Sequence, residues 1–117
     1  MRICVVGTGY VGLVTGAGLA EFGMEVACVD KDEEKIALLQ RGGMPFYEPG
    51  LEDLVVKNCA EGRLRFLTDL GEGVRWAQVI FVAVGTPPNS DGSADLSQVE
   101  EAVREIARHM DGYRIIV

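Results

Sequence analysis

Short apolar runs alternate along the chain with longer segments in which apolar residues recur at helical spacing. The apolar runs predict five strands, over residues 2–6, 25–29, 63–67, 78–84 and 113–117. The helical spacing predicts helices between them, at about 11–22, at about 32–41, from 51 to 58, briefly after 68, and from 95 to 110. Strands that alternate with helices in this way are typical of a parallel sheet with helices on both faces.

The composition of the individual runs indicates where each strand lies in this sheet. The run at 78–84 is continuously apolar after Gln78, as expected for a strand buried on both faces, whereas 63–67 is half charged and suits a strand near the edge. Right-handed crossovers then predict a doubly wound, Rossmann-like α/β fold with strand order 3-2-1-4-5. Because the chain ends within the run at 113–117, we expect a complete first mononucleotide-binding half and only the beginning of the second.

Several residues predict where the helices begin and end. Gly23 is suited to end the first helix, and Asp32 is suited to cap the second. Thr68 is the expected cap of the brief helix that follows it. Asp95 and Gln98 have the spacing of a capping box at the start of the last helix.

The turn Gly7-Thr8-Gly9-Tyr10-Val11-Gly12 follows the first strand and opens the first helix. Gly7 permits the tight turn, Gly9 lets backbone N–H groups approach a pyrophosphate, and Gly12 lets the helix pack closely on the strand. The unpaired N–H groups and the positive dipole end of the helix would then face the phosphates. This succession of strand, glycine turn and helix predicts a dinucleotide-binding site.

Asp30 ends the second strand, near the offset of about 20 residues from the glycine turn at which an acid binds the adenosine ribose. Its carboxylate would accept hydrogen bonds from both ribose hydroxyls and would repel a 2′-phosphate, which favours NAD over NADP. The alternative is that Asp30 caps the next helix, although Asp32 is better placed to do so.

Composition argues against several classes of function. The chain has 117 residues, a net charge of −7 and no cluster of Lys or Arg, so nucleic-acid binding is not expected. Its three cysteines share no CxxC spacing and it has one histidine, so we expect a reducing compartment and no metal site. Since it has neither a signal peptide nor an apolar run of about 20 residues, we expect a soluble, cytoplasmic protein with no membrane partner.

Further motifs carry a resemblance to a known family. The segment Val84-Gly85-Thr86-Pro87 is followed by DGSADL at 91–96, and PFYEPGL occupies 45–51. Together with the turn at 7–12 and the pair Val29-Asp30, these motifs extend over the whole chain in a fixed order. In this respect the chain resembles the NAD-binding domains of the UDP-glucose/GDP-mannose dehydrogenase family.

The resemblance implies a longer enzyme, with a central domain that makes a homodimer or higher homo-oligomer and a C-terminal domain that binds a nucleotide sugar. Family members oxidise the C6 alcohol of the sugar to a carboxylate in two steps with two NAD. UDP-glucose is the expected substrate, with GDP-mannose and UDP-N-acetylmannosamine as alternatives.

A catalytic cysteine is also implied by the resemblance, in a segment beyond these residues. Its thiolate captures the aldehyde as a thiohemiacetal and then forms a thioester that water cleaves. None of Cys4, Cys28 and Cys59 matches the motif of that cysteine. We therefore expect no catalytic residue within residues 1–117, which would form the NAD-binding domain and be inactive alone.

The resemblance assigns several residues to the cofactor, NAD. Backbone N–H groups of Tyr10 and Val11 are expected to lie over the pyrophosphate, and Lys35 is expected near the adenosine ribose with Asp30. Thr86 corresponds to a threonine that contacts the cofactor. On the local sequence alone, Lys35 would be a solvated lysine in a charged segment, and Thr86 would be a turn hydroxyl.

Two other classes of function remain open. A free-standing module that binds NAD without turnover would need no catalytic residue, and a methyltransferase would hold S-adenosylmethionine with a glycine loop and an acid after the second strand. Three remaining residues are expected to be structural. Glu48 would belong to a proline-bounded helix entry, Trp76 would pack in the core, and His109 would lie at a surface helix end.

Overall fold

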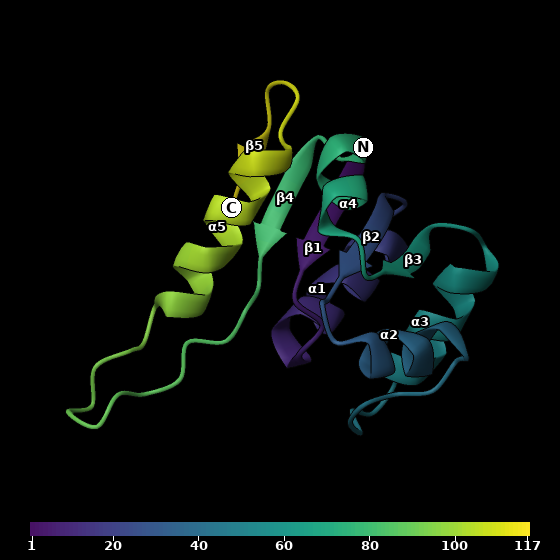
Figure 1. The fold of residues 1–117 in the computed structure, drawn as a ribbon. Coiled ribbons are helices and arrows are strands. Elements are labelled where there is room, and N and C mark those ends of the chain that lie inside the picture. Colours follow the sequence, from purple (N-terminus) through teal and green to yellow (C-terminus); the bar gives the residue numbers. More distant parts are fainter.

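The structure is a computed structural model that describes all residues from 1 to 117. Its five strands are β1 (Arg2–Val6), β2 (Glu25–Val29), β3 (Leu64–Leu67), β4 (Val79–Val82) and β5 (Ile115–Ile116). Its five helices are α1 (Tyr10–Glu21), α2 (Glu33–Gln40), α3 (Leu51–Ala60), α4 (Leu70–Trp76) and α5 (Ser97–His109). All strand pairs are parallel and their order is β3-β2-β1-β4-β5, which confirms the predicted doubly wound fold (Figure 1).

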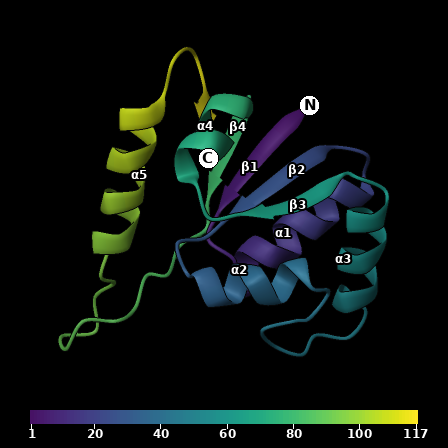
Figure 2. The ribbon, with the colours of Figure 1, turned by 45° about the vertical axis from the view of Figure 1, so that its right-hand side comes forward.

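The helices cover both faces of the sheet (Figure 2). α1, α2 and α3 bury one apolar core against it, and α4 and α5 bury a second. Side chains alternate along β1, so that Ile3 and Val5 lie in the first core and Cys4 and Val6 lie in the second. None of the five helices combines the length and apolar character that crossing a membrane requires.

Each core contains a cysteine packed against a glycine of the covering helix. A Cβ added to Gly16 of α1 would lie 2.6 Å from Cys28 Sγ, and one added to Gly73 of α4 would lie 2.9 Å from Cys4 Sγ. Burial raises the pKa of the Cys4 thiol to about 12 and also raises that of Cys28. Both cysteines are therefore protonated packing residues, whereas Cys59 on α3 is half-buried.

The ends of the first helices agree with the sequence patterns, and the start of α4 does not. Gly23, with a φ of +99°, follows Phe22, the residue that caps the C-terminus of α1. The carboxylate of Asp32 accepts a hydrogen bond from the Lys35 amide (3.1 Å) and caps α2, as predicted. Thr68 was the wrong choice of cap for α4, because Asp69 accepts the amide hydrogen bond at its start (3.2 Å).

The predicted capping box at the start of α5 is also wrong. α5 begins at Ser97, and the carboxylate of Asp95 accepts a hydrogen bond from the Ser97 amide (2.9 Å). A capping box would need the Asp95 amide to donate to Gln98, but this amide donates to the carbonyl of Pro87 (2.7 Å). The loop between β4 and α5 therefore determines where the helix begins.

The last strand is shorter than the predicted 113–117. Residues before β5 are drawn toward the C-terminus of α4, because the guanidinium of Arg114 donates to the carbonyls of Val74 (2.8 Å) and Arg75 (2.9 Å). Both carbonyls are in the last turn of α4, where no backbone amide of the helix can reach them. Arg114 thus closes α4, and β5 begins only after it, at Ile115.

Candidate functional site

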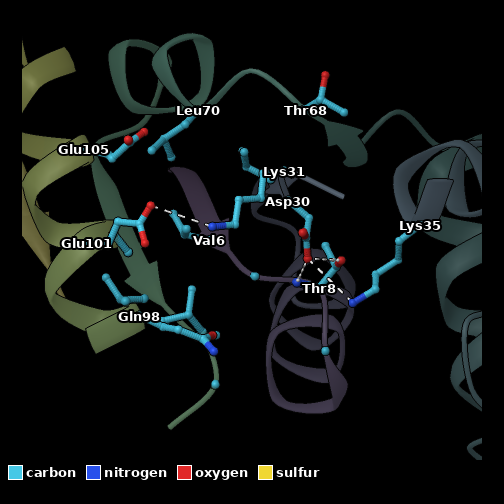
Figure 3. Close-up of a pocket in the computed structure, with 18 of the residues that line it drawn as sticks. Val6, Thr8, Asp30, Lys31, Lys35, Thr68, Leu70, Gln98, Glu101 and Glu105 are labelled. Atoms are coloured by element: carbon cyan, nitrogen blue, oxygen red, sulfur yellow. Dashed lines mark hydrogen bonds and ion pairs between the residues drawn. The ribbon is translucent and has the colours of Figure 1, made fainter. Parts of the chain in front are cut away.

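A cleft of about 960 Å³ opens at the carboxyl ends of the strands, where the strand order reverses between β1 and β4 (Figure 3). It is lined by the turn after β1, the end of β2, the loops after β3 and β4, and one face of α5. Of the predicted cofactor-binding residues, all but Gly12 line it: Gly7, Gly9, Tyr10, Val11, Asp30, Lys35 and Thr86.

The fold itself requires two glycines of the turn. Gly7 has a φ of +104°, and a Cβ there would lie 2.6 Å from the carbonyl oxygen of Ala83 at the end of β4. A Cβ on Gly12 would overlap the carbonyl oxygen of Gly7. These two residues allow the chain to turn tightly and α1 to start directly above β1 and β4.

Gly9 has a different environment from the other two. Its φ of −76° and ψ of −166° are open to any residue, and a Cβ there would have no atom of the chain within 4 Å. Gly9 precedes α1, and no side chain caps this helix. Neither backbone strain nor packing within the chain explains why the residue is a glycine.

The first turn of α1 presents unpaired backbone donors to the cleft. The first intrahelical bond is donated by Leu13 to the carbonyl of Gly9 (2.9 Å), so the amides of Tyr10 and Val11 have no helical acceptor. The ring of Tyr10 packs against Phe46, with ring centroids 5.8 Å apart. An anion at this position would meet the free N–H groups and the positive end of the helix dipole.

The carboxylate of Asp30 lies in the same cleft, held by neighbouring donors. Its Oδ2 accepts hydrogen bonds from the amide (3.0 Å) and the hydroxyl (2.7 Å) of Thr8, and its Oδ1 accepts one from the amide of Asp32 (3.0 Å). Lys35 Nζ lies 3.9 Å from Oδ2. The structure thus brings the turn after β1, the end of β2 and α2 together at one carboxylate. Asp32, not Asp30, caps α2, so the alternative role of Asp30 as a cap is wrong.

These contacts keep Asp30 ionised. Burial alone would raise the pKa of this carboxyl, but the Asp32 amide, the hydroxyl and amide of Thr8, and the charge of Lys35 together hold the pKa below its usual range. Because the pKa is lower in the folded chain, these contacts stabilise the fold at neutral pH, and the stabilisation is lost as the pH falls through the lowered pKa.

Thr86 lines the cleft from the loop between β4 and α5, and it is exposed. This loop closes on itself through a bridge between Pro88 and Ala94 and a hydrogen bond from the Asn89 amide to the Ser93 carbonyl (2.7 Å). Thr86 lies before this closed part of the loop. Its hydroxyl has no hydrogen-bond partner within the chain, so the structure provides no internal role for it.

The sequence patterns did not identify the side of the cleft formed by α5. Gln98, Glu101 and Glu105 follow one another at helical spacing on that face, and Lys31 after β2 reaches across to Glu101, with 3.8 Å between Nζ and Oε1 (Figure 3). The spacing of three and four residues between these side chains could have shown from the sequence that they share one face of a helix. Assigning the face to the cleft, however, required knowing that α5 packs beside β4.

Three residues predicted to be structural occupy different places. Trp76 packs against the second core, and the Arg65 guanidinium lies 4.7 Å from the centroid of its ring. Glu48 lies outside the cleft. His109 is at the end of α5, as predicted, but it is half-buried and belongs to the lining of the cleft. The imidazole of His109 packs against Gly71 of α4, where an added Cβ would lie 2.9 Å from His109 Nδ1.

Comparisons with known proteins identify the family. Residues 1–117 match the NAD binding domain of the UDP-glucose/GDP-mannose dehydrogenase family. UDP-glucose 6-dehydrogenases of Rhizobium meliloti and Bacillus subtilis are 52% and 50% identical to the chain, and both matches cover the whole of this chain. The chain spans 27% of the length of both relatives.

Solved structures agree with this assignment. The GDP-mannose dehydrogenase of Pseudomonas aeruginosa superposes with a TM-score of 0.93 at 39% identity, over 99% of this chain and 27% of that one. The UDP-N-acetyl-mannosamine dehydrogenase of Staphylococcus aureus superposes with a TM-score of 0.90 at 32% identity, over 99% of this chain and 28% of that one. The chain therefore belongs to the UDP-glucose/GDP-mannose dehydrogenase family, of which it is the NAD-binding domain.

Proposed function

We propose that the chain binds NAD in the cleft at the carboxyl ends of β1 and β4, and that it supplies this cofactor to a nucleotide-sugar dehydrogenase. The pyrophosphate would lie over the start of α1, and the adenosine ribose would lie beside the end of β2. Of the cofactor residues predicted from the sequence, Gly12 would act indirectly, by letting α1 start close to the turn. The others line the cleft and are assigned to NAD: Gly7, Gly9, Tyr10, Val11, Asp30, Lys35 and Thr86.

Gly9 carries this proposal. The fold needs no glycine there, and the space that a Cβ would fill is open cleft beside the free amides of α1. A ligand that approaches the backbone closely accounts for a glycine at such a position. A pyrophosphate is such a ligand, because it accepts hydrogen bonds from the amides of Tyr10 and Val11 and is stabilised by the helix dipole.

Asp30 and Lys35 fit the adenosine ribose of NAD better than that of NADP. The Asp30 carboxylate is ionised and borders the cleft, so it can accept a hydrogen bond from a ribose hydroxyl and repels a 2′-phosphate. Lys35 Nζ, 3.9 Å from Asp30 Oδ2, can donate to the same ribose. When bound, NAD supplies a hydride acceptor, and the residues of this chain bind and orient it.

The substrate of the whole enzyme is inferred from the relatives. The two UDP-glucose 6-dehydrogenases are about half identical to the chain, whereas the GDP-mannose 6-dehydrogenase of Pseudomonas syringae is 42% identical over 106 residues. We therefore favour UDP-glucose as the substrate, oxidised to UDP-glucuronate by a cytoplasmic homo-oligomer. The catalytic cysteine and the sugar site would lie in segments outside residues 1–117.

Calorimetric titration of the chain with four ligands tests the cofactor assignment. ADP-ribose is expected to bind within about threefold of NAD, because the sheet contains the first mononucleotide half and only the start of the second. NADP and S-adenosylhomocysteine are expected to bind much more weakly than either. Binding of NAD far tighter than ADP-ribose, or preference for S-adenosylhomocysteine, would contradict the assignment.

Asp30→Ala tests the contact with the ribose. Because a hydrogen bond to a charged group is lost, NAD is expected to bind about tenfold more weakly, and the gap between NAD and NADP is expected to narrow. Asp53→Ala is the matched control, since it removes a carboxylate from the first turn of α3, outside the cleft, and should leave both affinities unchanged. An unchanged preference for NAD in Asp30→Ala would exclude Asp30 as the residue that selects the ribose.

A further inference from the structure

Thr8 is the one residue between Gly7 and Gly9, and it is fully buried although it belongs to the lining of the cleft. Only one other polar residue of the chain, Asn58, is buried to the same extent. Both donors of Thr8, the amide and the hydroxyl, bind the same oxygen, Asp30 Oδ2, at 3.0 and 2.7 Å. The hydroxyl bond joins the turn after β1 to the end of β2.

These bonds leave Asp30 little freedom. An ionised carboxylate offers about four acceptor positions, two on each oxygen. Thr8 fills both positions on Oδ2, and the Asp32 amide fills one on Oδ1 at 3.0 Å. One position, on Oδ1, remains for a ligand. Lys35 Nζ is 3.9 Å from Oδ2, too far for a hydrogen bond, so it does not fix the carboxylate in the same way.

We propose that Thr8 is a positioning residue whose hydroxyl fixes the carboxylate of Asp30 for the ribose, and thereby sets the preference for NAD over NADP. This inference rests on the proposed function, in which Asp30 binds the adenosine ribose. With Oδ2 held by Thr8, one ribose hydroxyl donates to Oδ1, and the second hydroxyl is left to Lys35. The selectivity for the ribose is thus set partly by a residue whose amide and hydroxyl donors are both bound to Asp30 and not to the ligand.

The hydroxyl has two effects on Asp30. First, it prevents the carboxylate from rotating, so that no conformational freedom is lost when the ribose binds. Second, it donates to the ionised form, which helps to hold the pKa of Asp30 below its usual range and keeps a full negative charge facing any 2′-phosphate. Removing the hydroxyl therefore weakens NAD binding and reduces the exclusion of NADP.

Two substitutions separate the hydroxyl from the packing of Thr8. Thr8→Val keeps the shape of the side chain and removes the donor, whereas Thr8→Ser keeps the donor and removes a methyl group. Each variant of the 117-residue chain is titrated calorimetrically with NAD and NADP. In parallel, the ¹³C carboxyl resonance of Asp30 is followed by NMR as a function of pH, and the melting temperature reports any loss of stability.

We expect Thr8→Val to bind NAD about tenfold more weakly, because a hydrogen bond to a charged group is lost. The affinity for NADP should fall by a smaller factor. The Asp30 resonance should titrate at higher pH in this variant. Thr8→Ser should bind NAD within about twofold of the wild type and keep its selectivity, since its hydroxyl can make the same bond.

Several results would overturn the inference. The first is unchanged NAD affinity and selectivity in Thr8→Val. The second is tighter NAD binding in Thr8→Val, because Oδ2 has been freed. The third is an equal loss of NAD affinity in Thr8→Val and Thr8→Ser. If Thr8→Val does not fold, Thr8→Ala compared with Thr8→Ser gives the same contrast. A wild-type chain that does not bind NAD would refute the proposed function instead, and the Asp30 resonance would still report whether Thr8 fixes the carboxylate.

Discussion

Replacing Gly12 with alanine is expected to lower the free energy of unfolding by about 2–4 kcal/mol, a large part of the stability of a small domain. The new Cβ would overlap the carbonyl oxygen of Gly7, which belongs to the backbone and cannot move aside as a flexible side chain would. The start of α1 would have to shift away from β1 and β4. Urea unfolding followed by circular dichroism measures the change.

Gly18→Ala is the matched control for this variant. Gly18 lies in the same helix, and a Cβ there would have no atom of the chain within 4 Å. Alanine is favoured over glycine inside a helix, so this substitution should raise stability by about 0.5–1 kcal/mol. Equal stability of Gly12→Ala and Gly18→Ala would contradict the close approach of α1 to the turn.

Gly9→Ala, unlike Gly12→Ala, is expected to keep the stability of the fold and to lose NAD affinity, by about a hundredfold or more. The backbone at Gly9 suits alanine, and the Cβ meets nothing within the chain. It would, however, occupy the space through which the pyrophosphate reaches the amides of Tyr10 and Val11. Calorimetric titration with NAD, together with a melting curve, distinguishes the loss of the ligand from a loss of the fold.

Gly18→Ala again serves as the control, since it adds the same methyl group to α1 away from the cleft and should bind NAD like the wild type. Wild-type affinity in Gly9→Ala would mean that no ligand approaches the backbone at this position. The two substitutions in the turn thus separate a glycine that the fold requires from one that the ligand requires.

The order of the strands was predictable because it depends on patterns that local sequence carries. The apolar run at 78–84, the half-charged run at 63–67 and the handedness of crossovers were sufficient. The helix starts were harder to predict. At α4, Thr68 and Asp69 are adjacent candidates for one cap. At α5, the Asp95 amide donates its hydrogen bond to the carbonyl of Pro87 instead of to Gln98. Competition among neighbouring polar groups decides such cases, and a sequence pattern does not rank them.

The candidate site divides in the same way. Gly7, Gly9 and Asp30 were identified because each has a role that depends on its own position after a strand. The role of Thr8 depends on a contact with Asp30, 22 residues away along the chain, and became evident only with both side chains in place. The α5 face of the cleft likewise depends on how a distant helix packs beside β4. Long-range contacts of this kind are what the sequence alone did not provide.

The packing of one cysteine on each face of the sheet makes this domain a natural reporter of its own local unfolding. Cys28 is enclosed beneath α1, and Cys4 is enclosed beneath α4. An alkylating reagent attacks the thiolate, so neither sulfur reacts until its covering helix moves away and the pKa returns to its ordinary value. The two modification rates therefore measure the opening of each layer separately, and they reveal whether α1 moves away from the sheet before α4 does.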